Sequence, residues 1–366
     1  MTADRPVVGF VLEQTLGHIT HSANLRELVA ADDRVDARFL PIDFAAEGWP
    51  ARVPGFGNWT IRAGLRARRA LRALRRDGRP DALYFHTQVP AILNVDHVRR
   101  TPTVVSLDAT PRQYDELGAH YAHGTGGKAV EQAKWRANRA CFARATAIVT
   151  WAAWTKQGLV DDYDVPAEKV HVIAPGVNTA RWGSPAERDA SGPVRVLFVG
   201  GDLVRKGGDV LVAAIEDLRR DSVPVEVDLV TRDDLAPRDG VRVHHGLTPN
   251  SDEIVDLYRR ADVFCLPTLG DCLPMVLSEA GALGLPVVST DVGAIHEIVR
   301  EGETGLLVPP SDPVALAAAL RRLSEDSALR RRLGDGARAL TVAEFDAATN
   351  ARRLVDLLLA VASGDR

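Results

Sequence analysis

The stretch from residue 196 to residue 208 restricts the fold of this chain more than any other part of the sequence. It begins as an apolar, valine-rich run, which is typical of a buried parallel strand. Gly200 and Gly201 follow, and glycine allows both a sharp turn and the close approach of a ligand to the backbone. Arg205 and Lys206 come next, before a second glycine pair opens a helical pattern. This order forms a phosphate-binding geometry; a plain turn with two solvated charges is the alternative.

The same alternation of strands and helices runs through both halves of the chain. In the first half, apolar runs predict strands at residues 7–12, 36–41, 82–85, 104–107, 147–150 and 170–173. In the second half, they predict strands at residues 194–199, 225–230, 241–244, 263–267, 285–289 and 305–308. Helical patterns lie between the strands, including residues 61–76 and 131–145. Alternation of this kind predicts an α/β fold with two doubly wound, largely parallel sheets.

A loop-like seam at residues 174–183 separates the two halves. The sequence therefore predicts an N-terminal domain at residues 1–178 and a C-terminal domain at residues 179–343. An amphipathic helix in residues 344–366 follows and could pack back on the first domain. Ligands in such sheets bind outside the carboxyl ends of the strands, so two facing sheets predict a cleft between the domains.

Composition limits the partners of the chain. A formal net charge of −4 gives no sign of a nucleic-acid partner. The three cysteines lack metal-ligand or disulfide spacing, which favours a reducing compartment and no metal site. No signal peptide or bilayer-spanning run is present, so we expect a cytoplasmic protein. The arginine-rich helix at residues 62–76 could touch a membrane, but a core-packed helix with a solvated basic face is the favoured interpretation. The sequence leaves open whether the chain forms a homodimer.

A second phosphate-binding element follows the strand at residues 263–267. Asp271 lies in the next loop, Pro274 suits the first turn of a helix, and Gly284 would end that helix. Glu279 falls in the second turn, with seven residues between it and Asp271. The helix start offers free N–H groups and a partial positive charge to an anion.

With these motifs in this order, the chain resembles the GT-B-fold retaining glycosyltransferases of family 4, most strongly over residues 145–345. Further matching segments are residues 168–178, which look like the family's domain-joining segment, 290–299 and 302–308. The resemblance implies a GT-B architecture, in which two Rossmann-like doubly wound domains face each other across a cleft. It implies that the first domain binds the acceptor and the second binds a nucleotide-sugar donor.

The resemblance also implies roles for particular residues. Arg205 and Lys206 would clamp the donor diphosphate, Glu279 would accept hydrogen bonds from the ribose, and Asp271 would hold a sugar hydroxyl. The implied donor-binding residues are Gly17, Gly200, Gly201, Arg205, Lys206, Thr231, Leu247, Asp271, Leu273, Met275, Val276 and Glu279. Those expected to act in catalysis are Asp108, Arg205, Lys206 and Asp271. An exposed helix carboxylate is the alternative interpretation of Glu279.

Two positions depart from the family pattern. The family usually has glutamate where this chain has Asp271, so the carboxylate is one methylene shorter. It often has arginine directly after the first glycine of the turn, where this chain has Gly201. We expect Arg205 to supply the missing charge from the next turn.

Polar side chains after the strands of the first domain are candidates for binding the acceptor. They are His18, His21, His86, Gln88, Asp108 and His120. Ordinary loop or helix-start histidines are the alternative for His18 and His21, and a turn aspartate before Thr110-Pro111 is the alternative for Asp108.

The sequence thus predicts a retaining glycosyltransferase that acts by front-side displacement. The expected co-substrate is a nucleotide-diphosphate sugar, with UDP and GDP favoured, and neither metal nor cofactor is required. A GT-B-fold sugar-nucleotide epimerase and a non-catalytic nucleotide-sugar binder are the alternatives. The acceptor stays open between a small metabolite, a natural-product intermediate, a lipid and a glycan.

Overall fold

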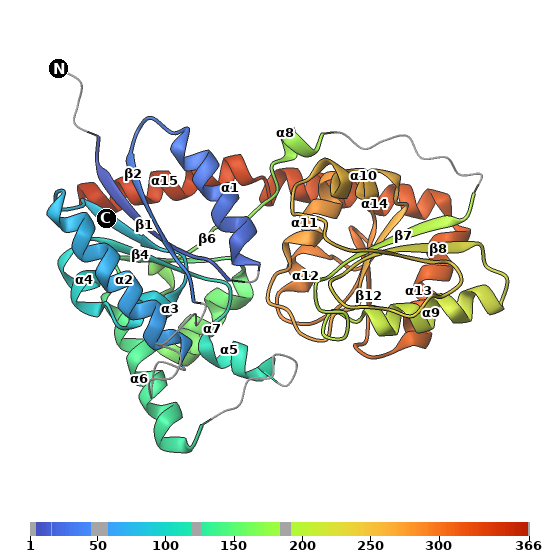
Figure 1. Ribbon diagram of the computed structural model, residues 1–366, viewed down its shortest axis with the longest axis horizontal. Coiled ribbons are helices and arrows are strands. Elements are labelled where there is room, and N and C mark those ends of the chain that lie inside the picture. The colour runs from blue at the N-terminus through green and yellow to red at the C-terminus, as the bar shows by residue number, and fades with distance from the viewer. Residues whose placement is uncertain (1–4, 16, 45–57, 119–125, 184–191, 365–366) are drawn as a thin grey trace. The chain divides into compact units, whose positions relative to one another are not determined.

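The computed structural model describes residues 5–15, 17–44, 58–118, 126–183 and 192–364. The chain forms two compact units (Figure 1). The first comprises Met1–Asp115, Gly124–Pro175 and Ala347–Arg366, and the second comprises Glu116–His123 and Gly176–Asp346. Each unit contains a six-stranded parallel sheet, as the alternation of strands and helices predicted.

The first sheet has the strand order β2-β1-β3-β4-β5-β6. Its strands are β1 (Val7–Glu13), β2 (Asp36–Ile42), β3 (Ala82–Phe85), β4 (Thr103–Leu107), β5 (Ala147–Thr150) and β6 (Val170–Val172). Alternate residues of a strand point to opposite faces. Accordingly, Phe10 and Leu12 of β1 belong to one buried core, whereas Val11 belongs to the core on the other face. Both faces of the sheet are therefore covered, which explains why its strands read as nearly continuous apolar runs.

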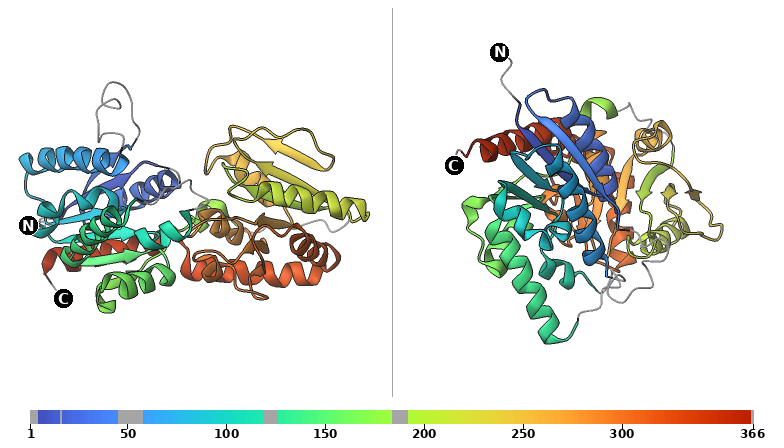
Figure 2. Two further views of the ribbon diagram at one scale, coloured as in Figure 1. Left: turned by 90° about the horizontal axis from the view of Figure 1, so that it is seen from below. Right: turned by 60° about the vertical axis from the view of Figure 1, so that its left-hand side comes forward.

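Helices from distant parts of the sequence cover these two faces (Figure 2). The helices of the first unit are α1 (His18–Ala30), α2 (Trp59–Arg76), α3 (Gln88–Ile92), α4 (Val95–Arg100), α5 (Pro111–Glu116), α6 (Lys128–Arg144), α7 (Ala153–Tyr163), the 3₁₀ turn η3 (Ala167–Lys169) and α15 (Ala347–Ser363). Leu25 of α1 and Leu354 of α15 join the core of Phe10, while Leu71 of α2 and Phe142 of α6 join the core of Val11. The last helix of the chain thus packs on the first sheet.

The second sheet has the order β12-β11-β10-β7-β8-β9. Its strands are β7 (Val194–Val199), β8 (Val225–Val230), β9 (Val241–His244), β10 (Val263–Leu266), β11 (Val287–Thr290) and β12 (Gly305–Val308). The helices of this unit are α8 (Thr179–Trp182), α9 (Gly208–Arg220), α10 (Asp252–Arg260), α11 (Met275–Ala282), α12 (Ile295–Ile298), α13 (Pro313–Glu325) and α14 (Ser327–Glu344). Strand β7 lies between β8 and β10, so the strand order reverses at β7. Doubly wound sheets bind ligands where the strand order reverses, so the carboxyl ends of β7 and β10 mark the expected ligand-binding edge of this sheet.

Some predicted boundaries were wrong. The strand placed at residues 285–289 is β11, which starts two residues later. The single helix placed after residue 343 is the end of α14, a break at Phe345, and α15. Pro274 precedes α11 with extended backbone instead of lying in its first turn. Gly284 does adopt the left-handed backbone, at φ +65°, that ends this helix.

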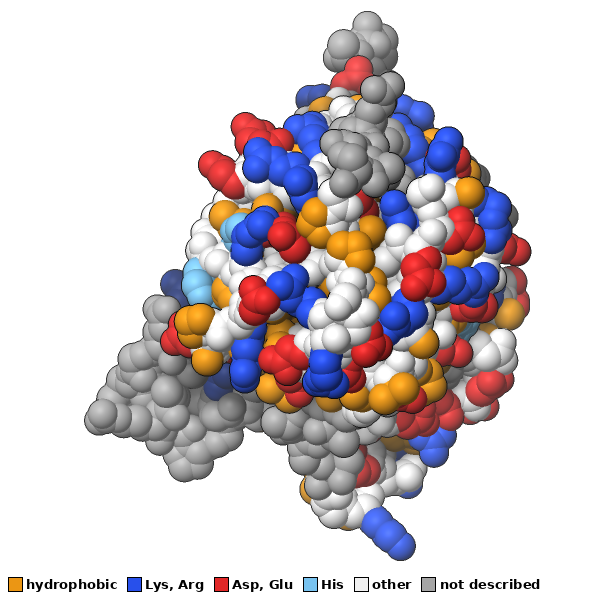
Figure 3. Space-filling model, turned by 90° about the vertical axis from the view of Figure 1, so that its right-hand side faces the viewer, with side chains coloured by type: hydrophobic (Ala, Val, Ile, Leu, Met, Phe, Trp, Pro, Cys, Tyr) orange, Lys and Arg blue, Asp and Glu red, His pale blue; other side chains and the backbone are white. Residues whose placement is uncertain are grey.

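The surface agrees with the mixed composition of the chain. On the face shown in Figure 3, acidic and basic side chains lie interspersed, without a large patch of one sign. In the part of the chain that the structure describes, none of the helices combines the length and apolar character that a bilayer-crossing segment needs.

Candidate active site

The glycine turn after β7 brings two cations to the carboxyl end of the second sheet. Gly207 has φ +73°, and a Cβ there would lie 2.0 Å from the carbonyl oxygen of Pro267, directly after β10. A Cβ at Gly200 would lie 2.9 Å from the Cβ of Lys206. No larger residue fits at either position without displacing its neighbours. Gly207 therefore lets the loop after β7 pack directly on the end of β10, and Gly200 lets Lys206 fold back close to the start of that loop.

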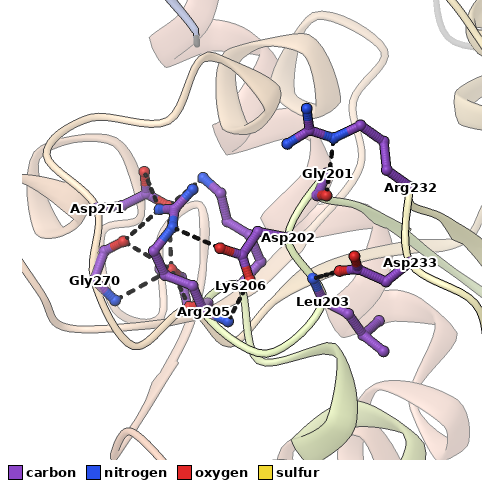
Figure 4. A network of polar contacts seen from close by, with 10 residues as sticks. Gly201, Asp202, Leu203, Arg205, Lys206, Arg232, Asp233, Gly270 and Asp271 are labelled. Carbon is purple, nitrogen blue, oxygen red and sulfur yellow. Dashed lines mark hydrogen bonds and ion pairs between the residues drawn. The ribbon is translucent and has the colours of Figure 1, made fainter. Parts of the chain in front are cut away.

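Lys206 and Arg205 both extend toward the loop after β10 (Figure 4). The Lys206 Nζ lies 2.5 Å from Oδ2 of Asp271, and the Arg205 Nη1 donates to the carbonyl of Gly270 at 2.9 Å. The Arg205 Nη1 is also 3.8 Å from Oδ1 of Asp271. The buried hydroxyl of Thr268 donates to Asp271 Oδ2 at 3.1 Å. The structure thus joins three predicted site residues in one cluster of opposite charges.

The side chains of this cluster are largely shielded from solvent, with 16%, 15% and 11% exposed for Arg205, Lys206 and Asp271. Charge pairs attract more strongly here than at an open surface, because less water screens them. A third glycine, Gly293, allows the close packing of the loop that carries the carboxylate. Gly293 has φ +57°, and a Cβ there would lie 2.2 Å from the carbonyl oxygen of Asp271. The position of Asp271 is therefore set by backbone packing as well as by its ion pairs.

Glu279 is buried in the second unit, at 7% exposure, so its interpretation as an exposed helix carboxylate was wrong. The hydroxyl of Tyr258 donates to Glu279 Oε2 at 2.9 Å. Burial raises the pKa of Glu279 to about 7, which the hydrogen bond from Tyr258 partly opposes. Tyr258 stacks on Phe264 and meets Trp182 edge-on. Tyr258 could not be singled out from the sequence, because its spacing in α10 is that of a core residue.

The remaining donor-site candidates surround the same edge of the sheet. Leu273 is buried, and Met275 and Val276 are half-buried in the first turn of α11. Thr231 follows β8; its N–H donates to the carbonyl of His244 at 3.2 Å, and its own carbonyl bonds His245 Nδ1 at 3.0 Å. Leu247 lies half-buried in the loop after β9. The hydrogen bonds at Thr231 join the ends of β8 and the β9 loop.

A cluster of imidazoles occupies the carboxyl edge of the first sheet. His18 and His21 start α1, and His86 follows β3. The ring centroids of His86 and His21 lie 4.8 Å apart, and those of His86 and His18 lie 5.1 Å apart. Trp151, which directly follows β5, contacts all three rings at 5.1 to 6.1 Å. Asp108 follows β4, with Oδ2 3.8 Å from His18 Nε2. The structure thus joins four acceptor-site candidates.

Burial controls the charge of this cluster. His86 is fully buried, and neither ring nitrogen makes a hydrogen bond of standard geometry with any residue that the structure describes. Burial lowers the pKa of His86 well below the ordinary histidine value, and the nearby His21 and His18 act in the same direction, against a smaller effect of the Glu13 backbone. Burial and then His18 lower the pKa of His21 to about 3. At neutral pH, His21 and His86 are therefore uncharged imidazoles.

Sequence reasoning missed Trp151 and Glu13. Glu13 ends β1 and is buried, with its carboxylate accepting hydrogen bonds from the hydroxyls of Thr15 and Thr87. Their signal was their place directly at the carboxyl end of predicted strands, where doubly wound sheets gather their ligand-binding residues. In the structure, Trp151 contacts the nominated rings of His18, His21 and His86. Glu13 accepts a hydrogen bond from Thr87, which directly follows His86.

Three further candidates from the sequence remain. Gln88 is half-buried at the start of α3. A Cβ at Gly17 would meet no described atom within 4 Å, so packing does not require glycine there. His120 lies outside the described residues. Among the described part of the chain, no three His, Cys, Asp or Glu side chains are arranged to hold a metal ion.

We expect His86→Gln to flatten the pH dependence of stability. Because the folded-state pKa of His86 lies below its ordinary value of 6.5, the unfolded chain takes up a proton as the pH falls below 6.5, and wild-type stability declines. The loss of unfolding free energy between pH 7 and pH 5 should shrink by about 2 kcal/mol in the variant. Urea unfolding at both pH values measures this, with His296→Gln, at an exposed imidazole, as control. An unchanged loss would contradict a neutral buried His86.

Two family models match the chain, one to each half. A model described as Glycosyltransferase Family 4 matches residues 25–181, and one described as Glycosyl transferases group 1 matches residues 193–326. Together they match residues in both units of the structure.

Curated relatives show the same affiliation. A glycogen synthase of Mycobacterium tuberculosis (strain ATCC 25618 / H37Rv) is 28% identical over 323 residues, which cover 85% of this chain and 75% of that protein. A D-inositol 3-phosphate glycosyltransferase of Streptomyces bingchenggensis (strain BCW-1) is 35% identical over 210 residues, or 49% of this chain and 45% of that protein. The second alignment thus spans about half of each protein.

Solved structures share the fold over nearly the whole chain. Sucrose-phosphate synthase from Thermosynechococcus elongatus gives a TM-score of 0.77 at 18% identity, over 99% of this chain and 100% of that one. Anabaena Alr3699/HepE in complex with UDP-glucose gives a TM-score of 0.71 at 17% identity, over 97% of this chain and 99% of that one. The expected pair of doubly wound α/β units of the GT-B fold is confirmed. With matching motifs, family models and fold in both halves, the chain belongs to the glycosyltransferases of family 4, the glycosyl transferases of group 1.

Proposed function

We propose that this enzyme transfers a sugar from a nucleotide-diphosphate sugar to a hydroxyl-bearing acceptor with retention of the anomeric configuration. The observation that carries the proposal is the cluster of Lys206, Arg205 and Asp271 at the reversal of strand order between β7 and β10. Two cations beside a glycine turn and the start of α11 suit a diphosphate. Asp271 can exchange its bond to Lys206 for a sugar hydroxyl when phosphate oxygens approach the ammonium.

The donor would be held along the carboxyl edge of the second sheet. Lys206 and Arg205 bind the diphosphate, with N–H groups near Leu273, Met275 and Val276 available to phosphate or sugar oxygens. Glu279 accepts hydrogen bonds from the ribose hydroxyls, and the backbone at Thr231 and Leu247 flanks the base. The structural neighbour Anabaena Alr3699/HepE was solved in complex with UDP-glucose. We take UDP and GDP sugars as the first candidates for this chain.

In the reaction, the bond between the anomeric carbon and the phosphate oxygen breaks while the acceptor oxygen bonds to the same face of the sugar. Negative charge grows on the leaving diphosphate, where the cations stabilise it. The acceptor proton passes to the departing phosphate oxygen; Asp108 is the alternative acceptor of this one proton. The sequence nominates no carboxylate for a double displacement, and neither a metal ion nor a cofactor is needed for these steps.

The acceptor would bind at the imidazole cluster of the first unit. The partly exposed side chains of His18 and Asp108 would contact the acceptor, with the buried rings of His86 and Trp151 packed against His18. These groups favour a polar, hydroxyl-rich acceptor over an aliphatic one. We further propose that the enzyme works in the cytoplasm.

A thermal-shift screen of the intact protein with UDP, GDP, ADP and TDP sugars tests this function. The matching donor should raise the unfolding temperature, because a ligand that binds the folded state stabilises it. Incubation with that donor alone should leave the sugar's configuration unchanged. No shift with any nucleotide sugar, or epimer formation without acceptor, would contradict the proposal.

A further inference from the structure

Arg232, which follows β8, reaches back over the glycine turn of β7 (Figure 4). Its Nε donates to the carbonyl of Gly201 at 3.0 Å. A Cβ at Gly201 would lie 2.9 Å from Nε, 3.2 Å from Nη2 and 3.3 Å from Cζ of Arg232. The guanidinium group therefore occupies the space that a side chain at position 201 would use.

The other cations of the turn are directed elsewhere. Lys206 pairs with Asp271, and Arg205 lies with Nε 3.4 Å from Asp202 and Nη1 on the carbonyl of Gly270. The expectation that Arg205 supplies the charge missing at position 201 is thus not what the geometry favours. Arg232 is exposed and, within the described residues, forms no ion pair with a carboxylate. Its terminal N–H groups are the cationic donors placed beside the turn itself.

We propose that Arg232 binds a phosphate of the donor, supplying from β8 the cation that the glycine turn lacks at position 201. The inference rests on the proposed function. The Nε–H bond to Gly201 fixes the direction of the guanidinium, and the planar fork leaves its terminal donors free to take a phosphate oxygen pair. Gly201 is then required to be small, because a larger side chain would displace Arg232.

Calorimetric titration of the intact protein with UDP and GDP, with inorganic pyrophosphate and with the free nucleosides tests the role of Arg232. Arg232→Ala should weaken binding of the diphosphates about tenfold, as expected for one charged hydrogen-bonding group. Nucleoside binding should not change. The matched control is Arg242→Ala on the neighbouring strand β9, where the guanidinium pairs with Glu226. Equal losses for diphosphate and nucleoside would overturn the proposal, since they would show only local disruption.

A charge swap separates phosphate binding from a structural role. Arg232→Ala vacates the space beside Gly201, and the double variant Gly201→Arg/Arg232→Ala should recover most of the lost diphosphate affinity. Failure to recover would overturn the proposal.

Lys206→Ala separates this proposal from the function on which it rests. Loss of diphosphate binding in Lys206→Ala with none in Arg232→Ala refutes only the role of Arg232, whereas no loss in either variant refutes the donor site as a whole.

Discussion

Lys206→Ala should lower the rate of sugar transfer by about 100- to 1,000-fold, the usual loss when one preorganised donor to a developing oxyanion is removed. The Nζ of Lys206 lies in a largely shielded cluster, so water cannot easily replace its charge. Steady-state kinetics with the donor identified by the screen measures the effect. Donor affinity should fall as well, because the variant lacks the ammonium group that would bind an oxygen of the donor diphosphate.

A matched control removes a cation of the same unit outside this cluster. Arg321 on α13 pairs with Asp221, and Arg321→Ala should keep wild-type kinetics. Because Lys206→Ala also leaves a shielded carboxylate partly unpaired, the double variant Lys206→Ala/Asp271→Asn checks for misfolding. It should recover thermal stability but not activity. Near-wild-type kinetics in Lys206→Ala would mean that the diphosphate binds elsewhere.

The sequence predicted the sheets well because both of their faces are covered. A strand such as β7 is apolar along most of its length, and the turn that follows it needs glycine at positions 200 and 207, where a Cβ would lie too close to its neighbours. Boundaries failed where tertiary contacts decide them. The break at Phe345 between α14 and α15 is one example, because the N–H of Val177 donates to the Phe345 carbonyl.

The candidate site was predictable at the strand ends but not across the sheet. Lys206 and Asp271 are 65 positions apart, and spacing alone cannot show that they pair. Arg232 and Tyr258 were missed for the same reason. Each acts through a neighbour, Gly201 or Glu279, that only the parallel pairing of the strands and the packing of α10 bring within reach.

Glu279→Gln should make the enzyme more stable at alkaline pH and a poorer binder of its donor. Burial raises the folded-state pKa of Glu279 from 4.5 to about 7. The folded state therefore binds more protons than the unfolded chain between these values, and wild-type stability falls as the pH rises through this window. At pH 8 the variant, which has no carboxylate to desolvate, should gain up to about 3 kcal/mol of unfolding free energy. At pH 5 the gain should fall below about 1 kcal/mol, because this pH lies only just above the unfolded-state pKa of 4.5.

Urea unfolding at pH 5 and pH 8 measures this difference. The variant keeps an oxygen that accepts the hydrogen bond from Tyr258, so packing around α10 should be preserved. Glu226→Gln on β8, at a partly exposed carboxylate paired with Arg242, is the control and should show no such pH-dependent gain. A gain equal at both pH values would point to packing and not to ionisation.

Donor binding should favour the ionised form of Glu279, whereas stability favours the protonated form. The ribose hydroxyls need a carboxylate oxygen as hydrogen-bond acceptor. Glu279→Gln should weaken binding of a nucleoside diphosphate about 100-fold at pH 8, near the upper range for charged hydrogen bonds. Wild-type affinity should decline as the pH falls below about 7, where Glu279 takes up its proton, and the variant should lack this decline. A 2′,3′-dideoxy nucleotide should bind wild type and variant alike. If wild type bound ribose and dideoxyribose nucleotides equally, Glu279 would not contact the ribose, and its burial would be a cost to stability that donor binding does not explain.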